Sequence, residues 1–393
     1  MNEDNIVLTF NAGSSSIKYG VFDCASGSPV TIGRGIVDLR REPLMLHMQQ
    51  GPAVENVPLT APLAEDLHEV IEEVLGRLKQ RFPLHELIAV GHRIVHGGDS
   101  FDGPVRIDDA NLAAMEALVP LAPLHQPHNL QPVRALRHLR PDLIQVASFD
   151  TAFHRTQSDL VRRFALPRNL FDQGIKRYGF HGLSYKYIAG RLATLEPGLA
   201  AGRVVVAHLG SGASLCAIEG GKSRDTSMGF STIDGLPMAT RCGALDPGVL
   251  LHLLGQRGMP FDELEDMLYH RSGLLGLSGI SADCRDLIES EDAAALEAVE
   301  YFAMRIAREA TSLATAMGGI DALVFTAGIG EHQPKVRELA CSHLAWLGVQ
   351  LSSAANAANA TRIDAAASAI AVLVVPTDEE QVVAEEVLAT CRN

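Results

Sequence analysis

Asn11-Ala12-Gly13-Ser14-Ser15-Ser16 is a polar turn that joins two apolar stretches, residues 6–10 and 17–22. A comparable turn, Gly210-Ser211-Gly212-Ala213-Ser214, follows apolar residues 204–208 and leads into a second apolar stretch that ends at 218. Glycine tolerates backbone angles that other residues resist and lets N–H groups approach an anion, while serine hydroxyls add hydrogen-bond donors. Either turn alone is also typical of an ordinary β-hairpin. Their repetition favours two related halves, each with a phosphate-holding loop.

The composition indicates a globular protein of two domains. The chain has 393 residues, of which 47% are hydrophobic and 20% are charged. This length exceeds the usual size of one domain, and the balance is ordinary for a folded protein. The formal net charge of -14 would repel nucleic acid and anionic membranes. We therefore expect neither as a partner, and we expect any bound phosphate to be held by local basic side chains and backbone donors.

The cysteines and the N-terminus indicate a cytoplasmic location. Six cysteines are scattered through the chain without a CxxC pair, at Cys24, Cys216, Cys242, Cys284, Cys341 and Cys391. This pattern argues against a zinc site or a disulfide framework and favours a reducing compartment. Residues 1–5 lack the basic region of a signal peptide, and no apolar run approaches the length of a membrane span. The sequence predicts no targeting signal.

Strands and helices are expected to alternate along both halves. Apolar spacing predicts helices over 64–82, 111–119, 293–317 and 379–391, and strands over 87–90, 142–149, 322–326 and 372–375. This alternation predicts an α/β fold. A glycine-rich loop, 327–331, follows one strand in a spacing that matches neither a Rossmann nor a P-loop motif. We expect domains at 1–150 and 151–393, with the terminal helix, about 379–393, as a candidate to pack back on the first.

Histidines gather in three short islands, residues 91–98, 123–128 and 178–182, each bracketed by glycine or proline. Such bracketing favours loops at strand ends, from which imidazole and guanidinium donors can meet an anion. A single histidine is more often structural than catalytic, but three similar islands favour a site. Zinc binding by His92 and His96 is an alternative, although the glycine pair after His96 and the apolar residues between them favour a strand end over a helix.

Acidic and basic residues at loop positions suggest a site for a cation and an anion. Asp150 and the run 377–380 follow apolar strands, where carboxylate oxygens could hold Mg²⁺. A helix cap at Thr377 or Asp378 is the alternative for that run, and both can hold together. Arg241 lies in a loop of small residues, 239–247, and its guanidinium could grip a carboxylate or a phosphoryl group. An ordinary surface arginine is the alternative there.

Nine motifs, in order along nearly the whole chain, together resemble the acetate kinase family of the actin and sugar kinase superfamily. They are NAGSSSIK (11–18), GHRIVHGG (91–98), APLHQ (122–126), FDTAFH (149–154), RYGFHG (177–182), DTSMGF (225–230), SGLLGLSG (272–279), FTAGIGE (325–331) and PTDEE (376–380). The resemblance implies two actin-like (ribonuclease H-like) domains with a nucleotide cleft between them. It also implies reversible in-line transfer of the ATP γ-phosphoryl group to acetate, which gives acetyl phosphate and ADP. Mg²⁺, with Mn²⁺ as an alternative, and a homodimer belong to the same expectation.

The resemblance also assigns roles to individual residues. Arg93 and Arg241 match arginines that hold the carboxylate and the transferring group, and His181 matches a transition-state-stabilising histidine. His125 and Asp150 match further active-site groups. The acyl pocket would be lined by Val95, Leu124, Phe180 and Thr232, the metal held near Asn11 and Glu379, and the first phosphate loop formed by Ser14, Ser16 and Lys18. Nucleotide contacts would come from His208, Leu209, Gly210, Ser211, Gly212, Asp283, Cys284, Arg285, Gly328, Ile329, Gly330, Glu331 and His332.

The chain departs from the family pattern at several of these positions. Ser211 and His332 stand where the family usually has asparagine, which bears on nucleotide affinity and base preference. The loop of Arg241 carries Ala239, Cys242 and Ala244, and Thr232 replaces a usual proline. A small pocket discriminates one methylene by only about 1–3 kcal/mol, so propionate, and less readily butyrate, remain alternative substrates. Because of these departures, a nucleotide-binding regulator that has lost turnover is an alternative function. The chain keeps every group expected to take part in the chemistry, which argues against that alternative: Arg93, His125, Asp150, His181, Arg241 and Glu379.

Overall fold

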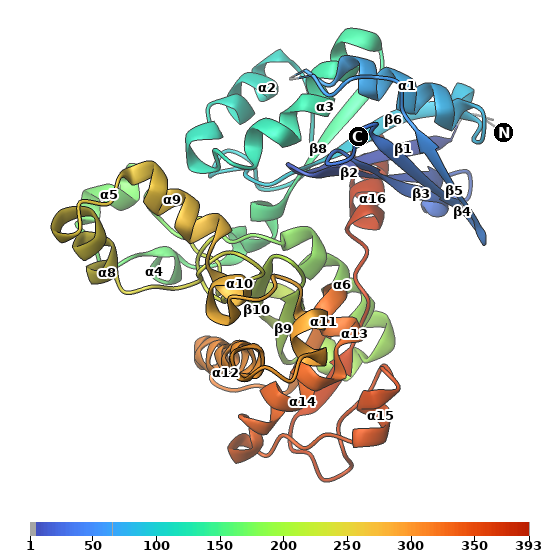
Figure 1. Cartoon of the computed structure of the whole chain (residues 1–393). Helices are drawn as coiled ribbons and strands as arrows, with labels where there is room; N and C mark the ends of the chain where they lie inside the picture. The colour runs from blue at the N-terminus through green and yellow to red at the C-terminus, as the bar shows by residue number, and fades with distance from the viewer. Residues whose placement is uncertain (1–4, 65, 393) are drawn as a thin grey trace. The chain divides into compact units, whose positions relative to one another are not determined.

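Two β-sheets organise the described residues, 5–64 and 66–392, of the computed structural model. Each sheet belongs to one of two compact units. Unit 1 holds the chain up to Phe153 and from Asp378 onward, and unit 2 holds His154–Thr377 (Figure 1). The expectation of no targeting signal rests largely on residues 1–4, which lie outside the described residues. Within those residues, every helix is too short or too polar to span a bilayer.

Unit 1 is built on an eight-stranded sheet of order β5-β4-β3-β2-β1-β6-β8-β7. Its strands are β1 (Ile6–Ala12), β2 (Ser16–Asp23), β3 (Val30–Asp38), β4 (Met45–Gln50), β5 (Ala53–Pro58), β6 (Leu87–Ile94), β7 (Val105–Arg106) and β8 (Ile144–Phe149). β1 pairs antiparallel with β2 and parallel with β6, which in turn pairs parallel with β8. The first predicted hairpin is therefore confirmed.

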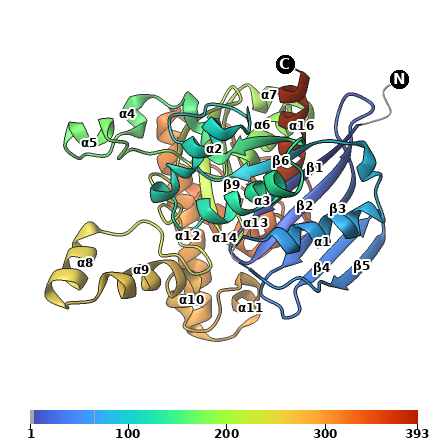
Figure 2. The same ribbon diagram turned by 90° about the horizontal axis from the view of Figure 1, so that it is seen from above.

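Helices cover both faces of this sheet. They are α1 (His68–Lys79), α2 (Asp109–Glu116), α3 (Gln126–Leu139) and α16 (Glu379–Arg392). Side chains alternate along β6, so Val90 joins a core with α1 and α3, whereas a Cβ at Gly91 would lie 2.4 Å from Val383 of α16. Figure 2 shows α1 over β3 and β4. The last helix of the chain thus belongs to the unit that contains the first strand.

Unit 2 repeats the central pattern of unit 1 in a five-stranded sheet of order β11-β10-β9-β12-β13. Its strands are β9 (Arg203–Leu209), β10 (Ala213–Glu219), β11 (Lys222–Thr226), β12 (Ala322–Thr326) and β13 (Ala371–Val374). β9 pairs antiparallel with β10 and parallel with β12, as β1 does with β2 and β6. The second predicted hairpin is confirmed, and the repetition of the turns reflects a repeated strand order.

Among the helices of unit 2, the long helix α12 packs on the sheet. The α-helices of this unit are α4 (Asp159–Arg162), α5 (Arg168–Asp172), α6 (Gly182–Leu195), α7 (Pro197–Ala200), α8 (Pro247–Leu251), α9 (Phe261–His270), α10 (Gly273–Ser278), α11 (Cys284–Glu289), α12 (Ala293–Ala316), α13 (Ala327–His332), α14 (Pro334–Ser342) and α15 (Ser353–Ala357). α12 contacts β9 and β10 and buries Ala298, Phe302 and Ile306. Its bounds agree with the predicted helix over 293–317.

One local prediction was only partly right and another was wrong. The island 91–98 was expected to be a loop at a strand end; the strand β6 does end within it, at Ile94, but His92 and Arg93 lie on the strand itself. The glycine-rich loop 327–331 is instead the helix α13, which begins with Ala327 at a left-handed φ of 64°. The Glu331 side chain accepts a hydrogen bond from the Ala327 N–H at 2.8 Å and satisfies the helix start. A side chain four residues ahead thus replaces the usual cap.

Candidate functional site

In unit 1, Arg93 lies at the centre of a polar cluster. Its Nε donates to Asp150 Oδ1 at 2.9 Å and its Nη2 to Asp150 Oδ2 at 2.6 Å, which is a bidentate pair. Its Nη1 donates to Asn11 Oδ1 at 3.0 Å, and Glu379 Oε2 lies 3.7 Å from Nε. These residues come from β1, β6, the end of β8 and the start of α16. Four predicted site residues are therefore neighbours.

The carboxylates dominate the electrostatics of this cluster. Burial would lower the pKa of Arg93, but the charges of Asp150 and Glu379 outweigh it and raise the pKa above its ordinary value. Burial raises the pKa of Glu380, and the neighbouring Glu379 adds to the rise. Asn11 Nδ2 bridges these two glutamates, at 3.3 Å and 3.5 Å. One guanidinium therefore faces an excess of carboxylates.

The chemistry of this donor set fits a hard divalent cation. Asn11 and Glu379 present amide and carboxylate oxygens, which are the ligands that Mg²⁺ prefers. Among residues 5–64 and 66–392, no group of three or more His, Cys, Asp or Glu side chains is arranged to hold a metal ion. Mg²⁺ usually keeps several waters and takes only one or two protein carboxylates, so a smaller set suffices. Asp378 Oδ1 accepts from the Gln381 N–H at 2.9 Å, which confirms the predicted helix cap.

Other predicted residues of unit 1 lie on the β1–β2 hairpin and at the start of α3. Lys18 is opposite Asn11 in the β1–β2 register, Ser14 lies in the turn between the strands, and Ser16 is the first residue of β2. His125 is the N-cap residue of α3, directly after Leu124, and both are half-buried. Sequence reasoning missed Asn129, whose Oδ1 accepts from the Val95 N–H at 2.8 Å and whose Nδ2 donates to the Ala12 carbonyl at 2.6 Å. A buried amide on an otherwise core-facing helix was its only signal.

In unit 2, His181 and Arg241 meet at the second glycine turn. A Cβ placed on Gly212 would lie 3.4 Å from His181 Nε2 and 3.8 Å from Arg241 Nη1. Arg241 Nη1 donates to the Thr232 carbonyl at 2.9 Å. The imidazole of His208 stacks on that of His181, with ring centroids 4.2 Å apart. The structure thus gathers a guanidinium and two imidazoles around the predicted phosphate-holding turn.

The loop of Arg241 is fixed by its backbone. The Leu274 N–H donates to the Met238 carbonyl at 2.8 Å, and the Leu275 N–H donates to the Ala239 carbonyl at 3.0 Å. Gly273, at a φ of 62°, permits this approach, because a Cβ there would lie 2.1 Å from the Met238 oxygen. The motif SGLLGLSG therefore supports the arginine loop, a role that its sequence alone did not reveal.

His154 is a second supporting residue that sequence reasoning missed. Its Nε2 is hydrogen-bonded to the Phe180 carbonyl and its Nδ1 to Ser223 Oγ, each at 2.9 Å. Burial lowers the pKa of His154 to about 4, so the ring is neutral near pH 7. The residue therefore anchors the backbone immediately before His181. Its place in the FDTAFH motif was the available signal.

The predicted nucleotide residues form three further segments of unit 2. Gly210 N donates to the Gly212 carbonyl at 3.0 Å, which closes the β9–β10 turn. The fully buried Arg337 donates to the carbonyls of Gly330 and Glu331 in α13, at 2.8 Å and 3.0 Å. Asp283 caps α11 and pairs with the Arg285 guanidinium at 2.6 Å. Leu209, Cys284 and Gly330 are buried, whereas His332 is exposed.

The match to known proteins decides the family. The model of the Acetokinase family matches residues 6–385. The chain belongs to the acetokinase family. It is similar to an acetate kinase of Rhodopseudomonas palustris (strain TIE-1), with 48% identity over 390 residues, 98% of each chain. The resemblance inferred from the motifs is thereby confirmed.

Solved structures of family members have the same fold. A propionate kinase from Francisella tularensis gives a TM-score of 0.90 at 34% identity, covering 97% of this chain and 98% of that one. An acetate kinase from Porphyromonas gingivalis gives 0.89 at 35% identity, covering 98% of this chain and 100% of that one. The predicted α/β fold with two actin-like units is confirmed.

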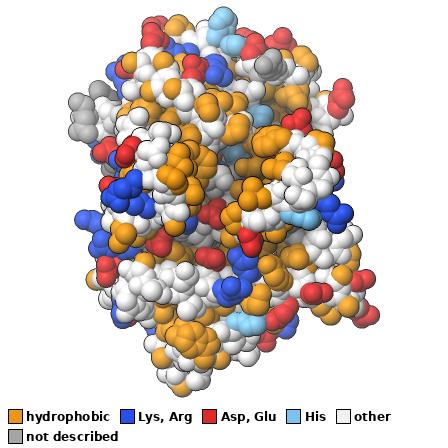
Figure 3. Space-filling view, turned by 90° about the vertical axis from the view of Figure 1, so that its left-hand side faces the viewer, with side chains coloured by type: hydrophobic (Ala, Val, Ile, Leu, Met, Phe, Trp, Pro, Cys, Tyr) orange, Lys and Arg blue, Asp and Glu red, His pale blue; other side chains and the backbone are white. Residues whose placement is uncertain are grey.

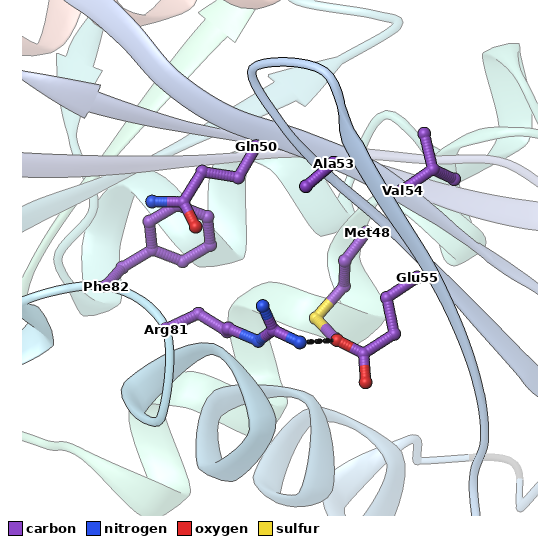
Figure 4. Close-up of a pocket in the computed structure, with 7 residues that line it drawn as sticks. All are labelled: Met48, Gln50, Ala53, Val54, Glu55, Arg81 and Phe82. Carbon is purple, nitrogen blue, oxygen red and sulfur yellow. Dashed lines mark hydrogen bonds and ion pairs between the residues drawn. The ribbon is translucent and has the colours of Figure 1, made fainter.

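A separate pocket of about 220 Å³ lies in unit 1, beside the β4–β5 hairpin. Its lining, drawn in Figure 4, consists of Met48, Gln50, Ala53, Val54, Glu55, Arg81 and Phe82. The Arg81 guanidinium forms an ion pair with Glu55 across the pocket. The sequence-predicted site residues lie elsewhere in the acetokinase fold.

Proposed function

We propose that this chain is an acetate kinase, which reversibly transfers the γ-phosphoryl group of ATP to acetate and gives acetyl phosphate and ADP. The observation that carries the proposal is the pair of clusters around Arg93 and Arg241, present in a chain that is 48% identical to a named acetate kinase along 98% of its length. Both clusters offer the cationic groups that bring an anionic acceptor to an anionic donor.

The proposed step is a direct in-line displacement. A carboxylate oxygen of acetate forms a bond to the γ-phosphorus while the bond from that phosphorus to the bridging oxygen of ADP breaks. Phosphoryl transfer depends on alignment and charge neutralisation rather than on covalent help. Arg93 pairs with the carboxylate, and Asp150 fixes its orientation through the bidentate contact. Arg241 and His181 donate to the oxygens of the transferring group near Gly212.

The proposed cofactor and nucleotide contacts are those that the resemblance to the family implies. Asn11 and Glu379 would hold Mg²⁺, with Mn²⁺ as the alternative, and the ion would offset the charge of the nucleotide phosphates. The turn 210–212 and the segments of α11 and α13 would hold ATP or ADP. His125 would add a donor beside the acyl group, whose pocket would include Val95, Leu124, Phe180 and Thr232.

A hydroxylamine trap for acyl phosphate tests the function. The protein is assayed with acetate, propionate and butyrate against several nucleoside triphosphates, with and without Mg²⁺. Acetate with ATP and Mg²⁺ should give the highest kcat/KM. A higher kcat/KM for propionate would show that the chain is a propionate kinase instead. The similarity to the Francisella propionate kinase is the reason to test this substrate. No product from any pairing would favour the nucleotide-binding regulator.

Arg241→Ala tests the role of the second cluster. This variant should lower acyl phosphate formation by about 10³-fold or more, because a positioned arginine stabilises the charge of the transferring group. Arg271→Ala is the matched control, since Arg271 lies in the same region but pairs with Asp266 at the surface. Both variants should show the same thermal unfolding as the parent. Near-normal turnover in Arg241→Ala would remove the assigned role.

We further infer a cytoplasmic homodimer. Large apolar side chains are exposed in unit 2, including Leu160, Leu251 and Phe261 at 81%, 71% and 65%. Figure 3 shows hydrophobic side chains exposed on one face of the molecule. Such exposure is typical of a surface that another chain covers. All six cysteines are free thiols, which agrees with a reducing compartment. Light scattering should give a molar mass twice that of one chain. In Leu251→Glu the measured mass should fall towards that of a single chain.

A further inference from the structure

His181 is held in unit 2 by stacking of its ring and by an anchor on the backbone before it. It precedes α6 with a left-handed φ of 55°, a conformation that is uncommon for a residue with a side chain. Its ring stacks on His208 with an interplanar angle of 18°. The backbone before it is tied to His154 through the Phe180 carbonyl. The imidazole therefore has a defined plane, and what remains to be set is which ring nitrogen carries the proton.

Two buried hydroxyls lie on the far side of this ring from the glycine turn. Ser214 Oγ, in β10, is 2.8 Å from His181 Nδ1. The hydroxyl of Tyr185, one helical turn after His181 in α6, is hydrogen-bonded to the same Ser214 oxygen. Ser214 and Tyr185 are each 0% exposed. Nδ1, Ser214 and Tyr185 thus form a buried chain, while Nε2 is the nitrogen near Gly212.

A hydroxyl can donate and accept at once, so this chain can run in either direction. In one arrangement of the neutral imidazole, Tyr185 donates to Ser214 and Ser214 donates to Nδ1, which leaves the proton on Nε2. When the imidazole is charged, Nδ1–H donates to Ser214, and Ser214 donates to Tyr185. Nε2 carries a hydrogen in this neutral arrangement and in the charged state. Its N–H remains a donor toward the turn at Gly212 whatever the charge of the ring.

We propose that Ser214 and Tyr185 are positioning residues that keep the His181 Nε2–H directed at the oxygens of the transferring phosphoryl group. The inference rests on the proposed function, because it takes His181 as a donor to that group. It adds two residues that act through the histidine rather than on substrate. Their loss would leave the ring in place by stacking but free to adopt the Nδ1–H tautomer, in which Nε2 cannot donate.

The kinetic test uses Ser214→Ala and Tyr185→Phe in the full chain. Ser214→Ala should lower kcat by about 10–100-fold, the range seen when a group that orients a metal-ligating histidine is lost. KM for ATP and for acetate should change by less than about 2-fold, because an interaction used only in the transition state is removed. Tyr185→Phe should have a smaller effect in the same direction. Equal kcat in Ser214→Ala and the parent would overturn the proposal.

A double-mutant cycle separates positioning from general damage. In a His181→Ala background, Ser214→Ala should lower kcat no further, because its effect passes through the missing ring. An additive loss would overturn the proposal. Ser148→Ala is the matched control, since Ser148 is also a buried serine on a strand, and its hydroxyl has no hydrogen-bond partner among the described residues. That variant should retain the parent kcat.

A spectroscopic test is independent of turnover. Long-range ¹H–¹⁵N correlation spectra of ¹⁵N-histidine-labelled protein report which ring nitrogen carries the proton. His181, assigned from the His181→Ala spectrum, should be the Nε2–H tautomer in the parent and a mixture in Ser214→Ala. The same tautomer in both proteins would overturn the inference. Since this measurement needs no substrate, it remains valid if the parent makes no acyl phosphate, whereas that result would overturn the proposed function. If Ser214→Ala fails to fold, Tyr185→Phe replaces it in both tests.

Discussion

The two arginines of the candidate site are held in opposite ways. Arg93 projects from a strand and is gripped by the Asp150 carboxylate, so its position depends on charge. Arg241 lies in a loop and donates to the Thr232 carbonyl, and the loop itself is hydrogen-bonded to α10 through backbone groups. One arginine therefore depends on particular side chains, while the other depends mainly on the backbone geometry of its loop. Substitutions that damage one support should spare the other.

Asp150→Asn should have the largest effect. It removes the bidentate partner of Arg93 and leaves Glu379, 3.7 Å away, as the remaining counter-charge, so the loss of stability should be at or below the roughly 3–5 kcal/mol of a broken buried ion pair. Acyl phosphate formation should fall strongly, and urea unfolding should show reduced stability. Asp321→Asn is the matched control, because Asp321 also forms a bidentate pair, with Arg203, but its side chain is 35% exposed. That variant should lose at most about 1 kcal/mol. Equal losses in both variants would contradict the special role of charge at Arg93.

Gly273→Ala should have the next largest effect, and it tests the loop support. The added Cβ would lie 2.1 Å from the Met238 oxygen, so the Arg241 loop must shift. A displacement on the order of 1 Å can lower kcat by about 10²-fold. Gly279→Ala carries the same backbone strain at a φ of 64° but has nothing within 4 Å of the new Cβ. Assays of both variants should show turnover falling only in the first. Normal turnover in Gly273→Ala would show that the loop can move without cost.

Acid should destabilise the protein because three histidines near the candidate site are buried in their neutral form. Burial lowers the pKa of His92 and His96 in unit 1, and of His154 in unit 2, from 6.5 to about 4. Below pH 6.5 these imidazoles therefore bind protons in the unfolded chain but stay neutral in the folded chain. Stability should be complete above pH 6.5 and should fall on the order of 1 kcal/mol per histidine for each pH unit down to about 4.

Urea titrations between pH 7 and pH 4.5 measure this effect. His92→Phe, which keeps an aromatic ring beside Phe10, should flatten the pH dependence of the free energy of unfolding. The exposed His252→Gln should leave the slope of the parent unchanged. An unchanged slope in His92→Phe would assign the acid response to other groups.

Cys242→Ser should have the smallest effect. The residue follows Arg241 directly, but its thiol contacts only the Gly243 carbonyl among the hydrogen bonds described, at 3.1 Å, while its N–H donates to the Leu268 carbonyl. Since the backbone carries the loop, kcat should stay within about 2-fold of the parent, as for a substitution worth about 0.5 kcal/mol. A large change in hydroxamate formation would show that side chains of the loop, and not only its backbone, position Arg241.

The sequence could predict elements whose pattern is local. Apolar periodicity predicts the two hairpins and α12. The family motifs identify Arg93, Asp150 and Glu379 as candidate site residues without any knowledge of their contacts. Features that depend on distant partners could not be predicted. The helical start at Ala327 requires the Glu331 side chain, and the strand β6 continues to Ile94 because β8 pairs along it. Asn129 and His154 support the site through backbone groups that a linear pattern does not reveal.

The placement of α16 sets an order for folding during synthesis. Val383 and Val387 pack beside Gly91, and Glu379 lies near Arg93, so unit 1 includes side chains that are translated after the whole of unit 2. His154–Thr377 is complete before those residues leave the ribosome. Unit 1 is therefore begun before unit 2 and finished after it, and a chain truncated before Glu379 would lack part of the core and of the polar cluster of unit 1.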